Sequence, residues 1–97
     1  MRRVVVRYPV KPDQADRNEQ LVRAVYEELH RADPAGFRYR TLRLADGVTF
    51  VHIAESEGAE APLSKLAAFQ EFQKDIAERC DEPPVAMEAT EVGSFGG

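Results

Sequence analysis

The feature that most constrains the fold of this chain is Asp46-Gly47, which separates two stretches of alternating apolar and polar residues. A period of two is typical of β-strands, and Asp-Gly between two such stretches is a strong hairpin signal. If Asp46-Gly47 forms a two-residue loop, Thr41 lies opposite His52. One face then carries Tyr39, Thr41, Arg43, Phe50, His52 and Ala54, and the other carries Arg40, Leu42, Leu44, Thr49, Val51 and Ile53. Both faces are partly apolar, so each requires a covering layer.

The segment before the hairpin is expected to form a strand and then an amphipathic helix. Residues 3–10 alternate with the period of a strand. Apolar residues then recur at helical spacing, and either Asp13 or Asp16 can cap this helix. Asp16 and Glu19 also have the spacing of a capping box. The sequence Asp-Pro-Ala-Gly at 33–36 ends the helix.

A second helix and a last strand are expected after the hairpin. Ser64 can cap this helix, and Pro83-Pro84 forbids its continuation. Its inner face carries Leu66, Phe69, Phe72, Gln73, Ile76 and Cys80. Residues 85–92 alternate as a strand, and residues 93–97 are expected to form a flexible tail.

The order of these elements, strand, helix, strand, strand, helix, strand, is typical of a ferredoxin-like α+β sandwich. This βαββαβ fold has a four-stranded antiparallel sheet with both helices on one face. The 97 residues, 43% of them hydrophobic, are enough for one such domain spanning 1–97. Because the helices cover one face only, the apolar residues on the other face need a partner. A second copy of the chain is the simplest one, so we expect a homodimer.

Charge is unevenly distributed along the chain. Residues 1–48 carry ten Lys and Arg against seven Asp and Glu, whereas residues 49–97 carry three against ten. In the expected topology the last strand lies near the first half, which would bring Glu88 and Glu91 close to Arg3 and Arg7. The net charge of -4 and the lack of a long basic run argue against a nucleic-acid partner.

Several other classes of protein are disfavoured by the sequence. A membrane span needs about 20 apolar residues, and neither such a run nor the apolar core of a signal peptide is found, so we expect a cytoplasmic protein with no membrane partner. Cys80 is the only cysteine and cannot close an intrachain disulfide. Without a cluster of Cys and His, we expect no metal, and we expect no cofactor.

With this order of elements the chain resembles the dimeric α+β barrel superfamily, in particular small proteins similar to the antibiotic-biosynthesis monooxygenases. The resemblance covers about residues 3–92. It rests on Val-Val-Val-Arg-Tyr-Pro-Val-Lys-Pro at 4–12, Thr-Phe-Val-His-Ile at 49–53 and Ala-Phe-Gln-Glu-Phe at 68–72. It implies that two sheets pack face to face across the dimer and that each subunit keeps a pocket between its sheet and its helices.

The resemblance does not extend to the superfamily members that degrade haem. These have an asparagine on the first strand, a tryptophan near the end of the third and a histidine in the second helix. Here the first strand has no asparagine and the chain has no tryptophan. Ser56 and Gln73 stand where the tryptophan and the histidine would be. The resemblance therefore implies no haem chemistry.

His52 is the residue best suited to exchange a proton near neutral pH and is our candidate catalytic residue. A pocket beside it could hold an aromatic or polyketide-like substrate, whose phenolic proton His52 would take so that the anion reacts directly with oxygen. The residues expected to bind this substrate are Tyr39, Thr41, Phe50, Phe69 and Gln73. The alternative is a structural histidine hydrogen-bonded to Thr41. Tyr8, Tyr26 and Tyr39 are interpreted mainly as packing residues with a satisfied hydroxyl.

Two classes of function follow from this reading. The first is a cofactor-independent monooxygenase acting on a small aromatic or polyketide-like compound. The second is a non-catalytic homodimer that binds a small ligand or serves as a structural module. The family resemblance favours the first, and the lack of a catalytic signature favours the second.

Overall fold

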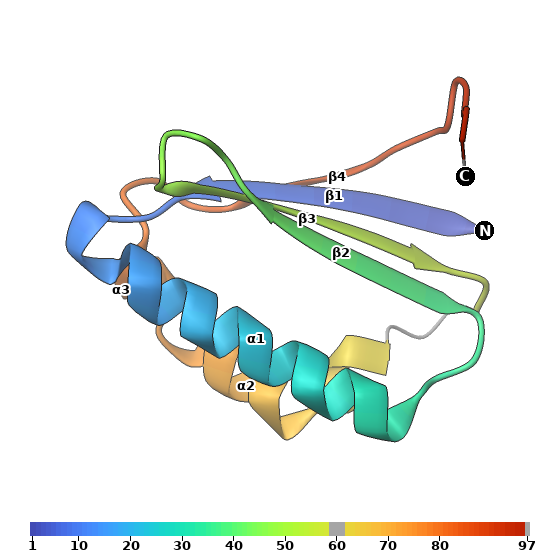
Figure 1. Ribbon diagram of the computed structural model, residues 1–97, viewed down its shortest axis with the longest axis horizontal. Helices are drawn as coiled ribbons and strands as arrows, with labels where there is room; N and C mark the ends of the chain where they lie inside the picture. The colour runs from blue at the N-terminus through green and yellow to red at the C-terminus, as the bar shows by residue number, and fades with distance from the viewer. Residues whose placement is uncertain (59–61, 97) are drawn as a thin grey trace.

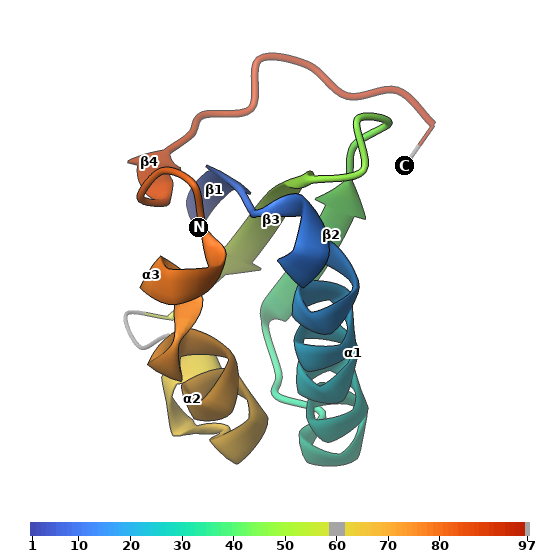
Figure 2. The ribbon, with the colours of Figure 1, turned by 90° about the vertical axis from the view of Figure 1, so that its left-hand side faces the viewer.

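Figure 1 shows a computed structural model of the chain, which describes residues 1–58 and 62–96 and has two layers. The elements are β1 (Arg2–Pro9), α1 (Ala15–Ala32), β2 (Phe37–Arg43), β3 (Thr49–Ser56), α2 (Ala67–Lys74), α3 (Ile76–Arg79) and β4 (Val85–Glu88), with 3-10 turns at Pro12–Gln14 and Pro62–Lys65. The sheet is antiparallel in the order β2-β3-β1-β4. The helices lie on one face of it (Figure 2). The predicted ferredoxin-like α+β fold is confirmed.

The hairpin of β2 and β3 has the predicted register but a longer loop. Thr41 pairs with His52, as expected. The two-residue loop is wrong: the Leu44 N–H donates to the carbonyl of Thr49, so residues 45–48 form the loop. Gly47 adopts a φ of 79°, while the Asp46 carboxylate accepts hydrogen bonds from the two amides of Val48 and Thr49. These bonds favour the wider loop, and the pairing is unchanged because the loop widens by one residue on each side.

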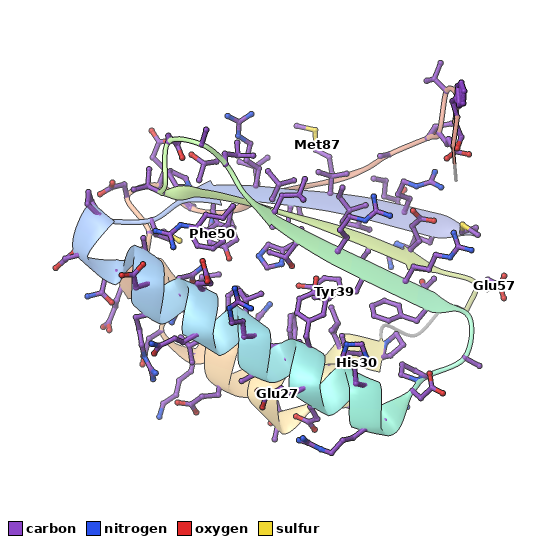
Figure 3. The ribbon with its side chains drawn as sticks, viewed as in Figure 1. Glu27, His30, Tyr39, Phe50, Glu57 and Met87 are labelled. Atoms are coloured by element: carbon purple, nitrogen blue, oxygen red, sulfur yellow. The ribbon has the colours of Figure 1, made fainter. Side chains whose placement is uncertain are left out.

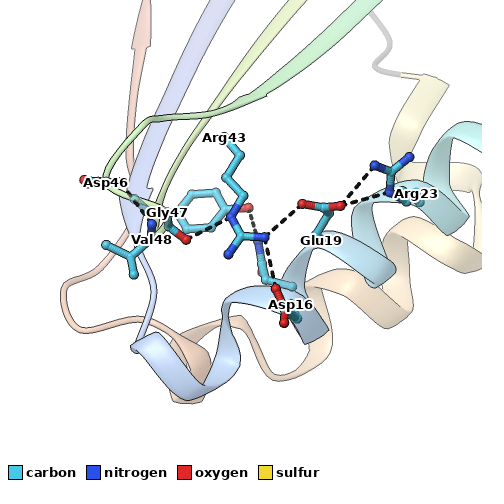
Figure 4. Close-up of polar contacts among 9 residues, drawn as sticks. Asp16, Glu19, Arg23, Arg43, Asp46, Gly47 and Val48 are labelled. Atoms are coloured by element: carbon cyan, nitrogen blue, oxygen red, sulfur yellow. Dashed lines mark hydrogen bonds and ion pairs between the residues drawn. The ribbon is translucent and has the colours of Figure 1, made fainter.

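The expected side-chain cap of α1 is also wrong. The helix follows a 3-10 turn, and its N-cap residue, Gln14, makes no capping side-chain hydrogen bond. Asp16 and Glu19 instead bind Arg43 of β2, whose Nη1 lies 3.1 Å from the Asp16 carboxylate and 2.9 Å from the Glu19 carboxylate (Figure 4). Glu19 also pairs with Arg23 one turn further along. The carboxylates therefore tie the helix to the hairpin.

The second helical segment is broken where one continuous helix was predicted. Ser64 lies inside the 3-10 turn, and α2 begins after Leu66, which makes no capping side-chain hydrogen bond. Glu28 of α1 takes the place of a local cap, since its carboxylate accepts hydrogen bonds from the backbone N–H groups of Ala67 and Ala68 at 3.3 and 2.8 Å. A carboxylate at this end also interacts favourably with the helix dipole. The two helices are thereby held side by side beneath the sheet.

The last strand is shorter than predicted, ending at Glu88 instead of Val92. It runs antiparallel to β1, and the Ala89 N–H makes a final hydrogen bond to the carbonyl of Arg3. The paired register with β1 ends at Val4 and Glu88, although β1 itself continues to Arg2. Val92 is fully exposed.

The predicted attraction between the two ends of the chain is confirmed in part. Arg3 lies 3.9 Å from Glu91 and 3.3 Å from Glu55. Glu88 pairs with Arg2, at 3.0 Å, and not with Arg3 or Arg7. The Arg2–Glu88 pair is exposed and contributes little to stability, whereas the side chains of Arg3 and Glu55 are only 19% and 23% exposed.

Replacing Glu28 with alanine is expected to destabilise the fold by about 1 kcal/mol, because the first amides of α2 lose their acceptor. Urea unfolding followed by circular dichroism measures the free energy of unfolding. Glu27→Ala is the matched control, since Glu27 is the exposed neighbour on the same helix. Equal destabilisation by the two substitutions would contradict a capping role for Glu28.

Candidate functional site

A cavity of about 440 Å³ lies between the sheet and the second helical segment. Its floor is made by side chains of the helix-facing side of all four strands, and its roof by the 3-10 turn, α2 and α3. The residues that line it are Arg2, Val4, Val6, Tyr8, Phe37, Tyr39, His52, Ala54, Ser56, Leu63, Phe69, Phe72, Gln73, Ile76, Pro84 and Ala86. The wall is mainly apolar.

The cavity contains His52 and three of the five residues predicted to bind a substrate. Tyr39, Phe69 and Gln73 line it with His52, and Figure 3 shows Tyr39 between the sheet and the helices. Phe50 and Thr41 do not line it, which corrects the predicted wall. A position on the same face of the hairpin as His52 is therefore not sufficient to place a side chain in the cavity wall.

Phe50 and Thr41 are displaced from the wall for different reasons. Phe50 lies nearer the hairpin loop, is 1% exposed and stacks on the ring of Tyr8 with 5.8 Å between centroids. Thr41 is hydrogen-bonded within the sheet, with its hydroxyl 3.0 Å from His52 Nδ1 and 2.8 Å from the hydroxyl of Tyr26. Thr41 therefore supports His52 through a hydrogen bond at Nδ1 and does not contact the cavity.

Both ring nitrogens of His52 have hydrogen-bond partners. The Tyr8 hydroxyl lies 2.7 Å from Nε2, and the hydroxyls of Tyr39 and Thr41 lie 2.5 and 3.0 Å from Nδ1. The imidazole is also stacked between the rings of Tyr8 and Tyr39. Its predicted position, on the helix side within reach of Thr41 or Tyr39, is confirmed.

The protonation states of these groups follow from their burial. His52 is 4% exposed, and this burial lowers the pKa of its imidazole to about 4, so the ring is neutral at pH 7. Burial also raises the pKa of Tyr8 and of Tyr39 well above the ordinary value for a phenol. Both hydroxyls therefore keep their protons at neutral pH and can donate hydrogen bonds.

Two buried residues that the sequence analysis did not select continue this polar cluster. The Asn18 amide nitrogen donates to the Tyr8 hydroxyl at 3.0 Å, and the Arg79 Nε donates to the Asn18 carbonyl oxygen at 3.1 Å. Arg79 also donates to the carbonyl of Phe72. A signal for Asn18 exists, because it lies three residues before Leu21 and so falls on the apolar stripe of α1. A polar residue on such a stripe indicates a buried partner.

Neither a metal site nor a membrane helix is found in the part of the chain that the structure describes. Over residues 1–58 and 62–96, no three His, Cys, Asp or Glu side chains gather in a way that could hold a metal ion. Within the same ranges, no helix is both long and apolar enough to cross a membrane.

Solved structures of several small proteins share this fold. A candidate antibiotic biosynthesis monooxygenase from Nitrosomonas europaea is 20% identical and superposes with a TM-score of 0.79, covering 96% of this chain and 100% of its own. Rv0793 from Mycobacterium tuberculosis is 17% identical with a TM-score of 0.76 and 98% coverage of both chains.

A third structure is a variant of SnoaB, a cofactor-independent oxygenase from Streptomyces nogalater. It is 17% identical, has a TM-score of 0.70, and covers 99% of this chain and 97% of its own. A scan against models of protein families finds no match, and neither does a search of curated proteins. At these identities the likeness establishes a common fold, the one that the resemblance implied.

The buried His52 is expected to make the protein less stable as the pH falls from about 6.5 towards 4. In this window the unfolded chain binds a proton at residue 52, whereas the folded chain, with its pKa of about 4, does not. The free energy of unfolding should therefore fall by about 2 kcal/mol between pH 7 and pH 5 from this group alone.

Urea unfolding at both pH values tests this, with His52→Gln expected to lose most of the decrease. His30→Gln is the control, because His30 is the other histidine and is exposed. A decrease that persists in full in His52→Gln would mean that another group causes it.

Proposed function

We propose that this protein binds a small, flat aromatic or polyketide-like compound in the cavity and, as a homodimer, oxidises it with O₂ without a cofactor. The observation that carries the proposal is the cavity wall, where Phe69 and Phe72 of α2 face a floor that carries the ring of Phe37 and the polar groups of His52 and Tyr39. Small-molecule sites are typically concave and apolar with a few polar groups, and have volumes of roughly 300–1,000 Å³. The volume of about 440 Å³ suits a compound of two or three fused rings.

The aromatic side chains support a flat ligand in particular. Phe69 and Phe72 lie 6.0 Å apart between ring centroids, and Phe37 stacks on Tyr39 at 5.9 Å. These separations are within the range of aromatic packing, so a planar ring system can make offset-stacked or edge contacts with several of them. An extended aliphatic ligand would not use this arrangement.

The chemistry needs no cofactor if the substrate supplies the electrons. A hydroxylated anthrone whose ring CH₂ loses a proton becomes an electron-rich anion that can reduce O₂. In the complete reaction the CH₂ group and one O₂ give a carbonyl group and one water, so the four electrons lost by the carbon reduce both oxygen atoms. The description of the similarly folded SnoaB as a cofactor-independent oxygenase supports this class of reaction.

A role for His52 as the base in this reaction stays a prediction. Its low pKa makes it a weak base, and Tyr8 and Tyr39 occupy its two nitrogens. Direct proton transfer from a ligand hydroxyl requires that the ligand take the place of one of these tyrosines. The occupied nitrogens specifically favour the alternative function, a non-catalytic homodimer that binds a small ligand.

The homodimer is supported by the sheet face that the helices leave bare. Its apolar residues are Val5, Leu42, Val51, Ile53, Val85 and Met87. Met87 is 66% exposed and points away from the helices (Figure 3), and Val85 is 54% exposed. A contiguous apolar patch on a sheet is typical of an interaction surface, and the same face of a second copy offers matching chemistry.

Addition of 1,8-dihydroxyanthrone to the metal-free protein is expected to raise oxygen uptake at least tenfold above the spontaneous rate. Ala54→Trp should abolish the increase, because the indole fills the cavity that Ala54 lines. Ala24→Trp, the same change at an exposed position of α1, should retain it. An oxygen electrode measures the rates.

The His52→Ala variant separates the two functions in the same assay. If His52 is the base, turnover should fall by about 100-fold while the dimer stays folded. Binding of the anthrone without oxygen uptake by the wild-type protein would establish the non-catalytic alternative and exclude the oxygenase.

Sedimentation at micromolar concentration is expected to detect a dimer in the wild-type protein. Ile53→Arg should give a monomer, because it places a positive charge at the centre of the bare face in both copies of the symmetric dimer. Ile53→Val is the control and should remain dimeric. A wild-type monomer would overturn the proposed assembly.

A further inference from the structure

We propose that the Tyr39 hydroxyl donates a hydrogen bond to an oxygen atom of the ligand. A chain of buried hydrogen bonds, which runs from Arg79 through Asn18, Tyr8 and His52, fixes the Tyr39 hydroxyl as a donor. This inference rests on the proposed function in one respect: the cavity must bind a ligand. It adds the chemical group that the ligand has to carry, an oxygen acceptor such as a ketone carbonyl. The donor direction of each hydrogen bond in the cluster leads to this conclusion.

Arg79 determines which atom of the Asn18 amide accepts a hydrogen bond and which atom donates one. Arg79 is 5% exposed. Among the described residues, no carboxylate lies within salt-bridge distance of its guanidinium group. Its contacts are the Asn18 oxygen, the Phe72 carbonyl and the Phe72 ring, whose centroid is 5.3 Å from the guanidinium carbon. A guanidinium can only donate hydrogen bonds, so the oxygen of the Asn18 amide must face it. The amide nitrogen therefore faces Tyr8.

The Tyr8 hydroxyl accepts a hydrogen bond from Asn18 and therefore donates its own hydrogen to His52. Its oxygen accepts the hydrogen bond from Asn18, and its side chain is fully buried. A buried hydroxyl needs an acceptor for its own hydrogen, and His52 Nε2 lies 2.7 Å away. Nε2 is therefore the acceptor. In a neutral imidazole the proton must then be on Nδ1.

The proton on His52 Nδ1 directs the hydroxyl hydrogen of Tyr39 towards the cavity. Nδ1–H donates to the hydroxyl oxygens of Tyr39 and Thr41, which lie 2.5 and 3.0 Å away. The Tyr39 hydrogen cannot be accepted by a nitrogen that already carries a proton. The Thr41 oxygen is a competing acceptor, because it lies beside the same nitrogen, but it is already 2.8 Å from the Tyr26 hydroxyl. The cavity that Tyr39 lines is the other direction for this hydrogen.

The geometry selects a class of ligand. An oxygen with free lone pairs, such as the carbonyl of an aromatic ketone, accepts the Tyr39 hydrogen, while the flat hydrocarbon part contacts Phe69, Phe72 and Ile76. The corresponding hydrocarbon has no acceptor and leaves the hydroxyl unpartnered or bonded to Thr41. Tyr39 is thus a binding residue, and Arg79, Asn18 and Tyr8 are positioning residues that act through His52.

The donor direction of these hydrogen bonds is tested on the wild-type protein by nitrogen-15 NMR of the His52 ring at pH 7. We expect a protonated Nδ1 and an unprotonated Nε2. In Tyr8→Phe, which removes the donor to Nε2, a second population with the proton on Nε2 should appear, a change that a purely structural role would not produce. A wild-type ring protonated on Nε2 overturns the proposal whether or not the variant folds.

The role of Tyr39 is tested with 9-fluorenone and fluorene, which share one flat skeleton and differ in a single carbonyl oxygen. Titration calorimetry on the wild-type protein should give tighter binding of fluorenone. In Tyr39→Phe the affinity for fluorenone should fall by about tenfold and that for fluorene should stay unchanged. Fluorene in the same variant is the control, because it offers no oxygen acceptor and so reports any general damage to the cavity.

The possible failures are distinguishable. If neither compound binds to the wild-type protein, the proposed function fails and the ligand role of Tyr39 fails with it. If both bind but Tyr39→Phe keeps the preference for fluorenone, the proposed function stands and this inference is overturned.

Discussion

His52 lies at the centre of the sheet, where an imidazole is almost out of reach of water, and a 2.7 Å hydrogen bond from the Tyr8 hydroxyl is what allows it to remain there. Leaving a buried polar atom without a partner costs about 1–3 kcal/mol, and this ring has two such atoms. The strand order provides partners on both sides: β1 contributes Tyr8, while β2 contributes Tyr39 and Thr41. The pairing of three strands and the hydrogen bonding of one side chain are therefore mutually dependent.

The helices enter the same cluster through Asn18 of α1 and Arg79 of α3. Arg79 brings a positive charge into the interior, where an amide oxygen, a backbone carbonyl and an aromatic ring stabilise it. Among the described residues no buried side-chain nitrogen or oxygen lacks a hydrogen-bond partner. A fully satisfied polar network of this kind holds its members in one arrangement, which gives the floor of the cavity a defined hydrogen-bond pattern.

The fold alone does not assign a reaction, because one architecture serves many functions and the site carries the chemistry. Here the site combines an apolar cavity with a neutral histidine whose nitrogens are both engaged. This arrangement is better suited to holding a ligand oxygen than to removing a proton with a free base. Oxidation by O₂ remains compatible with it, since an electron-rich anion that reacts with oxygen can be stabilised by hydrogen-bond donation as well as formed by proton transfer.

The amino-acid sequence by itself determined the order of the elements, the pairing of Thr41 with His52 and the side of the sheet on which His52 lies, because these depend on local periodicity and turn chemistry. It also indicated Tyr39, Phe69 and Gln73 as neighbours of one pocket. Only the tertiary structure decided that Asp16 and Glu19 bind Arg43 instead of capping their helix, that Glu28 caps a helix 39 positions away, and that Asn18 and Arg79 continue the cluster around His52. These contacts join residues far apart in the chain, and local patterns carry no record of which distant partner a side chain will meet.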